Sequence, residues 1–142
     1  MRLVGPALLL CTSGCLPFGA SFHLHRLEGA DSSPIPCHVR VHFGWQKATL
    51  TALPGGREVF TGSYPMVPTP PDRAMAPLWD RIYGTGYFTA KVLGSPQHVR
   101  VTLMAEGGRS IQMEVHHPPG SDRGGLEGVA VGPDGELYKV GL

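Results

Sequence analysis

Apolar and polar residues alternate with a period of two along most of the chain after residue 36. Residues 37–43 show the pattern most clearly, because Val39, Val41 and Phe43 are separated by polar residues. Successive side chains of a strand point to opposite faces of a sheet, so this period indicates a strand with one buried face. Cys37 shares the apolar side of the pattern and is predicted to be buried.

The same alternation recurs in short segments that are separated by glycine- and proline-containing turns. The expected strands cover residues 37–43, 46–53, 58–64, 86–93, 98–105, 111–115, 126–131 and 137–142. Pro133-Asp134-Gly135 is the strongest of the turn signals between them. Seven or eight short strands at this spacing are typical of an all-β fold, either a small antiparallel β-sandwich or a closed or partly open β-barrel.

The predicted inward sets are Val39-Val41-Phe43, Val99-Val101-Leu103 and Ile111-Met113-Val115, each of which occupies alternate positions of one strand. Residues 65–83 break the alternation, with prolines at positions 65, 68, 70, 71 and 77. Proline removes a backbone donor and is excluded from central strands, so a Pro-rich loop is expected here. Residues 72–82 are predicted to hold a short helical turn, with Trp79 packed over a mouth or an edge of the barrel.

The first fourteen residues have the order of a secretory signal peptide. Arg2 supplies a positive charge, residues 3–10 are apolar, and small residues precede Cys15. The apolar run is too short to span a bilayer. Thr12-Ser13-Gly14-Cys15 resembles the bacterial lipobox, whose cysteine carries a diacylglyceryl group after cleavage, although leucine is usual in place of Thr12. Secretion without lipidation and a buried N-terminal segment with no targeting role are the alternatives.

The predicted organisation is a lipoprotein signal peptide over residues 1–14, a tether over 15–36 and a single β domain over 37–142, with the Pro-rich loop at 65–83. A chain of 142 residues is the usual size of one domain. Twenty glycines and 14 prolines suit many short strands better than long helices. The net charge of +1 gives no basic footprint for nucleic acid, so no nucleic-acid partner is expected.

After removal of the leader and acylation of Cys15, Cys37 would be the remaining free thiol. It is expected to be an inert core residue, because His38, its neighbour, falls on the opposite face of the strand. His38 and His42 share a face, but they are separated by about 13 Å along a strand, too far to bind one tetrahedral ion. The histidines, including the pair His23 and His25, are therefore interpreted as surface residues, and no metal or other cofactor is expected.

Catalytic signatures are weak throughout the chain. The carboxylates fall in scattered turns, with no pair at the spacing of a glycosidase. Ser63 and Ser110 lack the strand-turn-helix context of a nucleophile elbow, and the Gly-Gly pairs do not open a helix as a phosphate loop does. We therefore predict that the protein is not an enzyme.

Two segments resemble a group of uncharacterised small bacterial lipoproteins that combine a lipobox leader with a small all-β domain. One is Phe60-Thr61-Gly62-Ser63-Tyr64, and the other runs from Gly128-Val129-Ala130 to the closing Asp134-Gly135-Glu136-Leu137-Tyr138 hairpin. The group often carries two cysteines where this chain has Met113 and Gly132, so the disulfide that the resemblance implies is missing. No activity comes with the resemblance, which implies only location and shape.

These observations predict a non-enzymatic, membrane-anchored envelope lipoprotein with a structural or partner-binding role. Leu16 follows the lipidation cysteine, and an Asp there resembles an inner-membrane retention signal, so the outer membrane is expected, with the domain facing the periplasm. The partners are the membrane, through the N-terminal lipid, and an envelope protein. The alternative is a barrel-type carrier of a small apolar ligand. A cavity lined by residues such as Phe60, Phe88 and Leu103 would favour the carrier, and a filled interior would favour the structural role.

Overall fold

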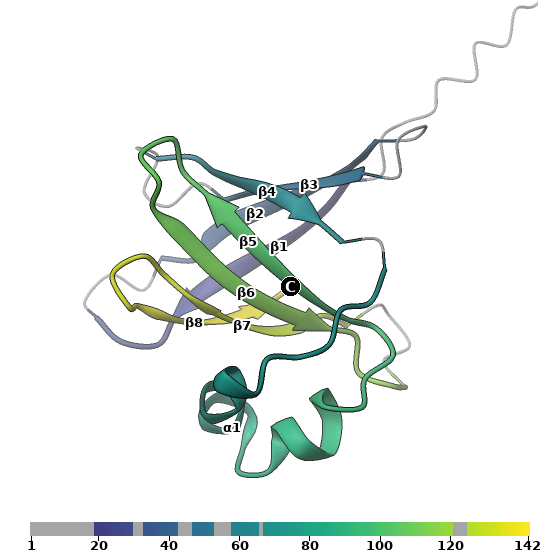
Figure 1. The fold of residues 1–142 in the computed structure, drawn as a ribbon. Coiled ribbons are helices and arrows are strands. Elements are labelled where there is room, and N and C mark those ends of the chain that lie inside the picture. The colour runs from purple at the N-terminus through teal and green to yellow at the C-terminus, as the bar shows by residue number, and fades with distance from the viewer. Residues whose placement is uncertain (1–18, 30–32, 43–46, 53–57, 66, 121–124) are drawn as a thin grey trace, which may run out of the picture.

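The computed structural model describes residues 19–29, 33–42, 47–52, 58–65, 67–120 and 125–142. Within these ranges, eight antiparallel strands follow one another. They are β1 (Gly19–Arg26), β2 (Ile35–His42), β3 (Lys47–Ala52), β4 (Phe60–Tyr64), β5 (His98–Met104), β6 (Ser110–His116), β7 (Glu127–Val131) and β8 (Leu137–Gly141). Each strand pairs with the next, and β8 pairs with β1, so the sheet closes into a barrel (Figure 1). The predicted all-β barrel is confirmed.

Closure depends on β1, which lies between β2 and β8. Leu24 sits opposite Ile35 of β2 on one side and opposite Val140 of β8 on the other. The β4–β5 pairing is the shortest, with Thr61 opposite Met104. With both neighbours in place, the backbone groups of β1 are paired on each side, which removes the exposed edges of an open sheet.

Apolar side chains from β1, β2 and β4 to β8 fill the interior of the barrel. The predicted inward sets of β5 and β6 are buried, and so are Cys37 and Val39, whereas the side chain of Val41 and residue Phe43 lie outside the described part of the chain. The main cluster contains Phe22, Leu24, Cys37, Val39, Phe60, Val99, Val101, Leu103, Ala105, Ile111, Met113, Val115, Ala130, Tyr138 and Val140. Burial of this apolar surface is the main favourable term in the stability of the fold.

The tether predicted for residues 15–36 is wrong over 19–26 and at its end. Gly19–Arg26 forms β1, and β2 already begins at Ile35. Phe22 and Leu24 alternate with polar residues and point into the core, where they are 2% and 0% exposed. The glycine, serine and proline residues around this segment are typical of a linker. The segment nevertheless forms a strand, because it pairs with both β2 and β8.

The strand predicted for residues 86–93 is also wrong, because Phe88–Val92 forms a π-helical segment, η3. Phe88 and Val92 are four residues apart and both buried, which places them on one side of a helical turn. A short run of apolar and polar residues fits both the two-residue period of a strand and the 3.6-residue period of a helix, and packing decides between them. The Pro-rich loop predicted at 65–83 therefore belongs to a longer helical excursion between β4 and β5.

This excursion also contains a 3₁₀ turn, η2 (Arg73–Met75), and the helix α1 (Ala76–Tyr83). Pro77 lies in the first turn of α1, where its missing N–H is not needed. Figure 1 shows the helices lying against the β6–β7–β8 side of the barrel. A second core forms there from Leu78, Trp79, Phe88, Val92 and Val129, all of which are buried. Trp79 thus packs on the outer wall, and not over the mouth or an edge.

Two glycines of the familiar-looking segments stand where strands approach closely. A Cβ atom on Gly62 would lie 2.2 Å from the carbonyl oxygen of Thr102 in β5. A Cβ atom on Gly128 would lie 2.6 Å from the carbonyl oxygen of Glu114 and from Cγ1 of Val115. Both contacts are with atoms that the barrel holds in place, so these positions exclude larger residues.

Candidate functional site

Cys15, the predicted lipidation site, lies outside the described residues, and the first strand begins at Gly19. Among the described residues, polar side chains gather beside the helical excursion in two places. One is buried between the excursion and the barrel, and the other is a hollow beside Tyr83.

A group of buried polar side chains lies on the outer face of β5 and β6, beneath the excursion. We define the buried polar cluster as Trp79, His98, Glu114 and His116. His98 and His116 are 0% exposed, and Glu114 is 2% exposed. His98 and His116 sit directly opposite each other in the β5–β6 ladder. Polar groups on this face would meet water in an uncovered barrel, and the excursion buries them here.

Glu114 is the acceptor at the centre of this cluster. The indole Nε1–H of Trp79 donates to Oε2 at 2.9 Å, and the backbone N–H of Asp72 donates to Oε1 at 2.6 Å. Nε2 of His98 lies 3.4 Å from Oε2 of Glu114. Both carboxylate oxygens are thus bonded to the excursion, and this compensates the cost of burying the carboxylate.

His98 is held from the other side by the start of the excursion. Its Nδ1 lies 2.7 Å from the carbonyl oxygen of Thr69, which identifies Nδ1 as the protonated nitrogen because a carbonyl can only accept. The backbone N–H of Thr69 donates to the carbonyl of His98 at 2.8 Å, and Thr69 Oγ1 accepts from the N–H of Arg100. The Pro-rich segment is therefore bonded to β5 at several points.

His116 lies among aromatic rings at the edge of the cluster. The rings of Trp79 and Tyr87 meet it edge-on, with centroids 5.3 and 6.1 Å from that of the imidazole. Its Nε2 is 3.4 Å from the Tyr87 hydroxyl and 3.5 Å from Oε2 of Glu127. Burial lowers the pKa of His116, and the nearby Glu127 carboxylate acts in the opposite direction. The neutral imidazole is the form that this environment favours.

Among the described residues, His98 Nε2 and His116 Nδ1 are buried and form no hydrogen bond. A proton added at Nδ1 of His116 would place a positive charge in a region with little access to water. His116 can therefore take up a proton only at a cost in stability. Within the described ranges, no group of three or more His, Cys, Asp or Glu side chains is arranged to hold a metal ion.

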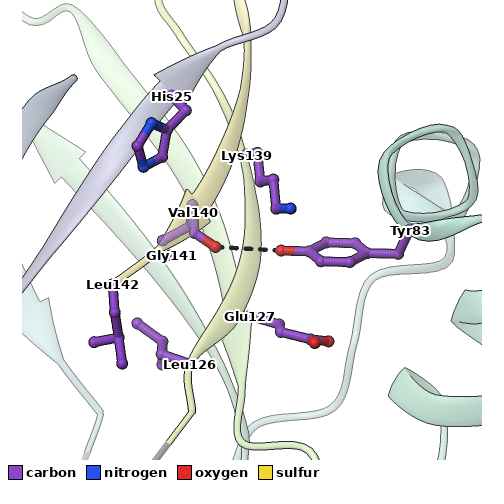
Figure 2. A pocket seen from close by; sticks show the side chains of 8 residues that line it. All are labelled: His25, Tyr83, Leu126, Glu127, Lys139, Val140, Gly141 and Leu142. Carbon is purple, nitrogen blue, oxygen red and sulfur yellow. Dashed lines mark hydrogen bonds between the residues drawn. The ribbon is translucent and has the colours of Figure 1, made fainter. Parts of the chain in front are cut away.

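A hollow of about 460 Å³ opens beside Tyr83, at the end of β8 (Figure 2). The Tyr83 hydroxyl reaches from α1 to the carbonyl oxygens of Gly128, at 3.0 Å, and Val140, at 3.2 Å. The backbone N–H of Gly128 donates to the same hydroxyl. Burial raises the pKa of Tyr83 to about 12, the hydrogen bond to Gly128 lowers it, and Glu127 raises it.

The lining of this hollow mixes both charges with apolar side chains. It consists of His25, Tyr83, Leu126, Glu127, Lys139, Val140, Gly141 and Leu142. The Lys139 ammonium lies 5.1 Å from the centroid of the Tyr83 ring, a cation–π contact. The hollow lies outside the barrel, so it is distinct from the interior cavity that a carrier of apolar ligands would need.

The cysteine and histidines that the sequence offers as candidate reactive or metal-binding residues lie in separate parts of the barrel. Cys37 is a buried free thiol, as predicted, and burial raises its pKa to about 12, which disfavours the reactive thiolate. The imidazoles of His23 and His25 lie on β1, with ring centroids 6.1 Å apart. His38 is exposed, and its Nδ1 lies 3.0 Å from Oγ of Ser21. His42 lies at the end of β2.

Sequence reasoning missed the buried polar cluster. Glu114 and His116 fall on the polar face of a strand, and such a face is normally in contact with water. The sequence predicts Trp79 in the excursion, but no local pattern pairs its indole with a carboxylate 35 positions away. One signal in the sequence points to this cluster, namely the many aromatic residues of the excursion. Such side chains have to pack against another surface of the protein to be buried.

No family model, no curated protein and no solved structure matches this chain. In the part of the chain that the structure describes, no helix is both long and apolar enough to cross a membrane.

Proposed function

We propose that this protein is a membrane-anchored envelope lipoprotein, held by acyl chains on Cys15, with a non-enzymatic structural or partner-binding barrel. The observation that supports it best is the start of β1 at Gly19. Three residues separate Cys15 from the first strand. A lipid on Cys15 would therefore leave every described strand pairing intact, and cleavage before Cys15 would remove none of the described residues.

The packed interior supports a structural or partner-binding role over the carrier. Phe60 and Leu103, two residues that would line a ligand cavity, are 1% and 0% exposed within the main core. Phe88, the third, packs in the second core, outside the barrel. A ligand would have to displace side chains already in contact, at a cost in packing energy.

The outer membrane, with the barrel in the periplasm, is the location that we propose. Leu16 follows Cys15. An Asp at this position would resemble an inner-membrane retention signal, and leucine has no acidic group. Two or three acyl chains anchor a protein stably, whereas one chain binds only marginally. The barrel then needs no membrane-spanning segment of its own.

Metabolic labelling with palmitate in a bacterial host tests this proposal. The full-length protein is expected to incorporate label and to fractionate with the outer membrane, because the thioether and acyl chains form on Cys15. The Cys15→Ala variant should incorporate none. Cys11→Ala and Cys37→Ala are matched controls and should be labelled like the wild type. Equal labelling of Cys15→Ala and wild type would refute the lipidation site.

A further inference from the structure

The hollow beside Tyr83 is lined by two opposite charges that are not paired with each other. Lys139 of β8 sits opposite Val129 in the β7–β8 ladder, so Glu127 occupies the diagonal position, about 7–8 Å away along the sheet. Both residues are described, and no ion pair joins them. The Tyr83 side chain lies between the two charged groups in Figure 2, and the Lys139 ammonium lies over its ring. Each charge is therefore available to a ligand.

The Glu127 carboxylate is held from behind by two buried or half-buried side chains. The Tyr87 hydroxyl donates to Oε2, and Nε2 of His116 lies 3.5 Å from the same oxygen. Nδ1 of His116 forms no hydrogen bond, which assigns the proton of the neutral ring to Nε2. Among the described residues, nothing bonds to Oε1 of Glu127. Glu127 therefore contributes a fixed carboxylate with one free acceptor to the wall of the hollow.

On the other side of the hollow, two donors stand next to each other. His25 of β1 sits directly opposite Lys139 in the β1–β8 ladder. Their neighbours Leu24 and Val140 are both buried in the core, so His25 and Lys139 belong to the outer face. Among the described residues, neither side chain takes part in a hydrogen bond or an ion pair. An ammonium beside an imidazole suits a carboxylate, which accepts from both.

The floor of the hollow is bare because residue 141 is a glycine. Val140 points into the core, so Gly141 and Lys139 both face outward. Gly141 sits opposite His23 of β1, and the register of β7 and β8 brings Glu127 next to it on the other side. A Cβ atom on Gly141 would meet no described atom within 4 Å apart from its chain neighbours. The missing side chain leaves room between the carboxylate and the donors.

The size and the lining of the hollow select the class of ligand. Its volume of about 460 Å³ lies in the range of small-molecule sites, roughly 300–1,000 Å³. A ligand with a single charge would pair with one wall and remove water from the unpaired charge of the other, which costs free energy. A ligand that carries both charges pairs with both walls. Leu126 and Leu142 add apolar surface to the same lining.

We infer that this hollow binds a small zwitterion, an α-amino acid or a short peptide with an apolar side chain. Its carboxylate accepts from Lys139 and His25, and its ammonium donates to Oε1 of Glu127. Its side chain packs against Leu126. The site lies on the outer wall of the barrel and does not depend on a lipid at Cys15, so either proposal can fail without the other.

NMR titration of the ¹⁵N-labelled full-length protein tests the site. The first probes are L-leucine and L-leucyl-L-leucine, which separate a free amino acid from a peptide as the source of the zwitterion. Isoamylamine is leucine without the carboxylate, and 4-methylpentanoate is leucine without the ammonium. For the peptide, amidation and N-acetylation remove the same charges. We expect saturable shifts at Lys139 and Gly141 with at least one zwitterion, and affinities about tenfold weaker or worse for its singly charged analogues.

Two charge variants assign the ends of the ligand. In Lys139→Gln, the zwitterion should bind no better than its analogue without the carboxylate. In Glu127→Gln, it should bind no better than its analogue without the ammonium. Lys91→Gln and Glu106→Gln remove the same charges at exposed positions outside the lining and should leave every affinity unchanged.

Gly141→Val tests the cavity without a change of charge. The added side chain should fill the floor and abolish binding. The fold should tolerate it, because no described atom is in the way and valine suits a strand. Gly94→Val changes an equally open glycine of the excursion and should bind like the wild type. Circular dichroism confirms that each variant is folded.

Three results would overturn the inference. The first is the absence of saturable shifts at Lys139 and Gly141 with both zwitterions at about 10 mM. The second is equal affinity of the wild type for a zwitterion and for its singly charged analogues. The third is binding by folded Gly141→Val that matches the wild type.

Discussion

Trp79 of α1 donates its indole N–H to the Glu114 carboxylate of β6, with 2.9 Å between the two atoms. This bond joins the helical excursion to the barrel, and both residues are buried where the two parts pack together. An isolated helix of eight residues is unstable in water, so α1 depends on such contacts. Glu114 in turn depends on the excursion, because a buried carboxylate without donors is costly.

Removal of the Glu114 carboxylate should therefore destabilise the whole domain. We expect Glu114→Ala to lower the free energy of unfolding by about 3 kcal/mol, because the Trp79 and Asp72 N–H groups lose their acceptor. Glu114→Gln should cost about 1–2 kcal/mol, since one oxygen becomes an NH₂ group facing a donor. Urea denaturation followed by Trp fluorescence measures both. Glu106→Gln, at an exposed turn, should stay within about 0.5 kcal/mol of wild type, and a similar value for Glu114→Ala would contradict the role of the cluster.

Acid should destabilise the domain through His116. Its pKa is lowered in the folded state from 6.5, so the unfolded chain binds more protons as the pH falls below about that value. Stability is then complete above the unfolded pKa and is lost as the pH falls towards the folded pKa. The contribution of His116 is at most about 1.4 kcal/mol per pH unit.

Thermal unfolding of the wild type and His116→Gln between pH 7.5 and pH 5 measures this contribution. Glu127, His98 and His117 also act on the charge of His116, and they remain in the variant. The variant should have a lower melting temperature at neutral pH but a shallower decline in acid. Parallel declines for the two proteins would show that His116 does not titrate in this range.

Close approach of strands makes Gly128 irreplaceable. Gly128→Ala would bring its methyl group within 2.6 Å of β6, and it should cost about 2 kcal/mol or more, because the neighbouring strand has to move. Gly94→Ala is the matched control, with no atom within 4 Å of the added carbon, and should stay within about 0.5 kcal/mol. Chemical denaturation of the two variants side by side decides the point, and equal stabilities would contradict it.

The barrel should need neither a disulfide nor a metal ion to fold. Leu103→Ala should cost about 2–4 kcal/mol, because it opens a cavity in a fully buried site. Reductant and EDTA should leave the melting temperature unchanged, and Cys37→Ala should still fold. A large decrease with EDTA would point to a histidine metal site, and one with reductant to a bridge between Cys37 residues of two chains.

Much of the barrel could be predicted from local pattern alone. The sets around Val101 and Met113 alternate strictly, and their burial follows from the period of a strand. The turn between β7 and β8 follows from Pro133 and its neighbours in the same way. Each of these signals is contained within a few consecutive residues, so it can be recognised without knowledge of the rest of the chain.

The sequence by itself determined the all-β class, the apolar faces of most strands and the buried state of Cys37, because side-chain alternation and backbone restrictions act locally. Only the tertiary structure decided that residues 19–26 close the barrel, that Phe88–Val92 is helical, and that Glu114 and His116 are buried. Each of these depends on contacts with segments far along the chain. A short run of mixed residues is compatible with a strand, a helix or a linker, and the surface that it can cover determines which of them forms.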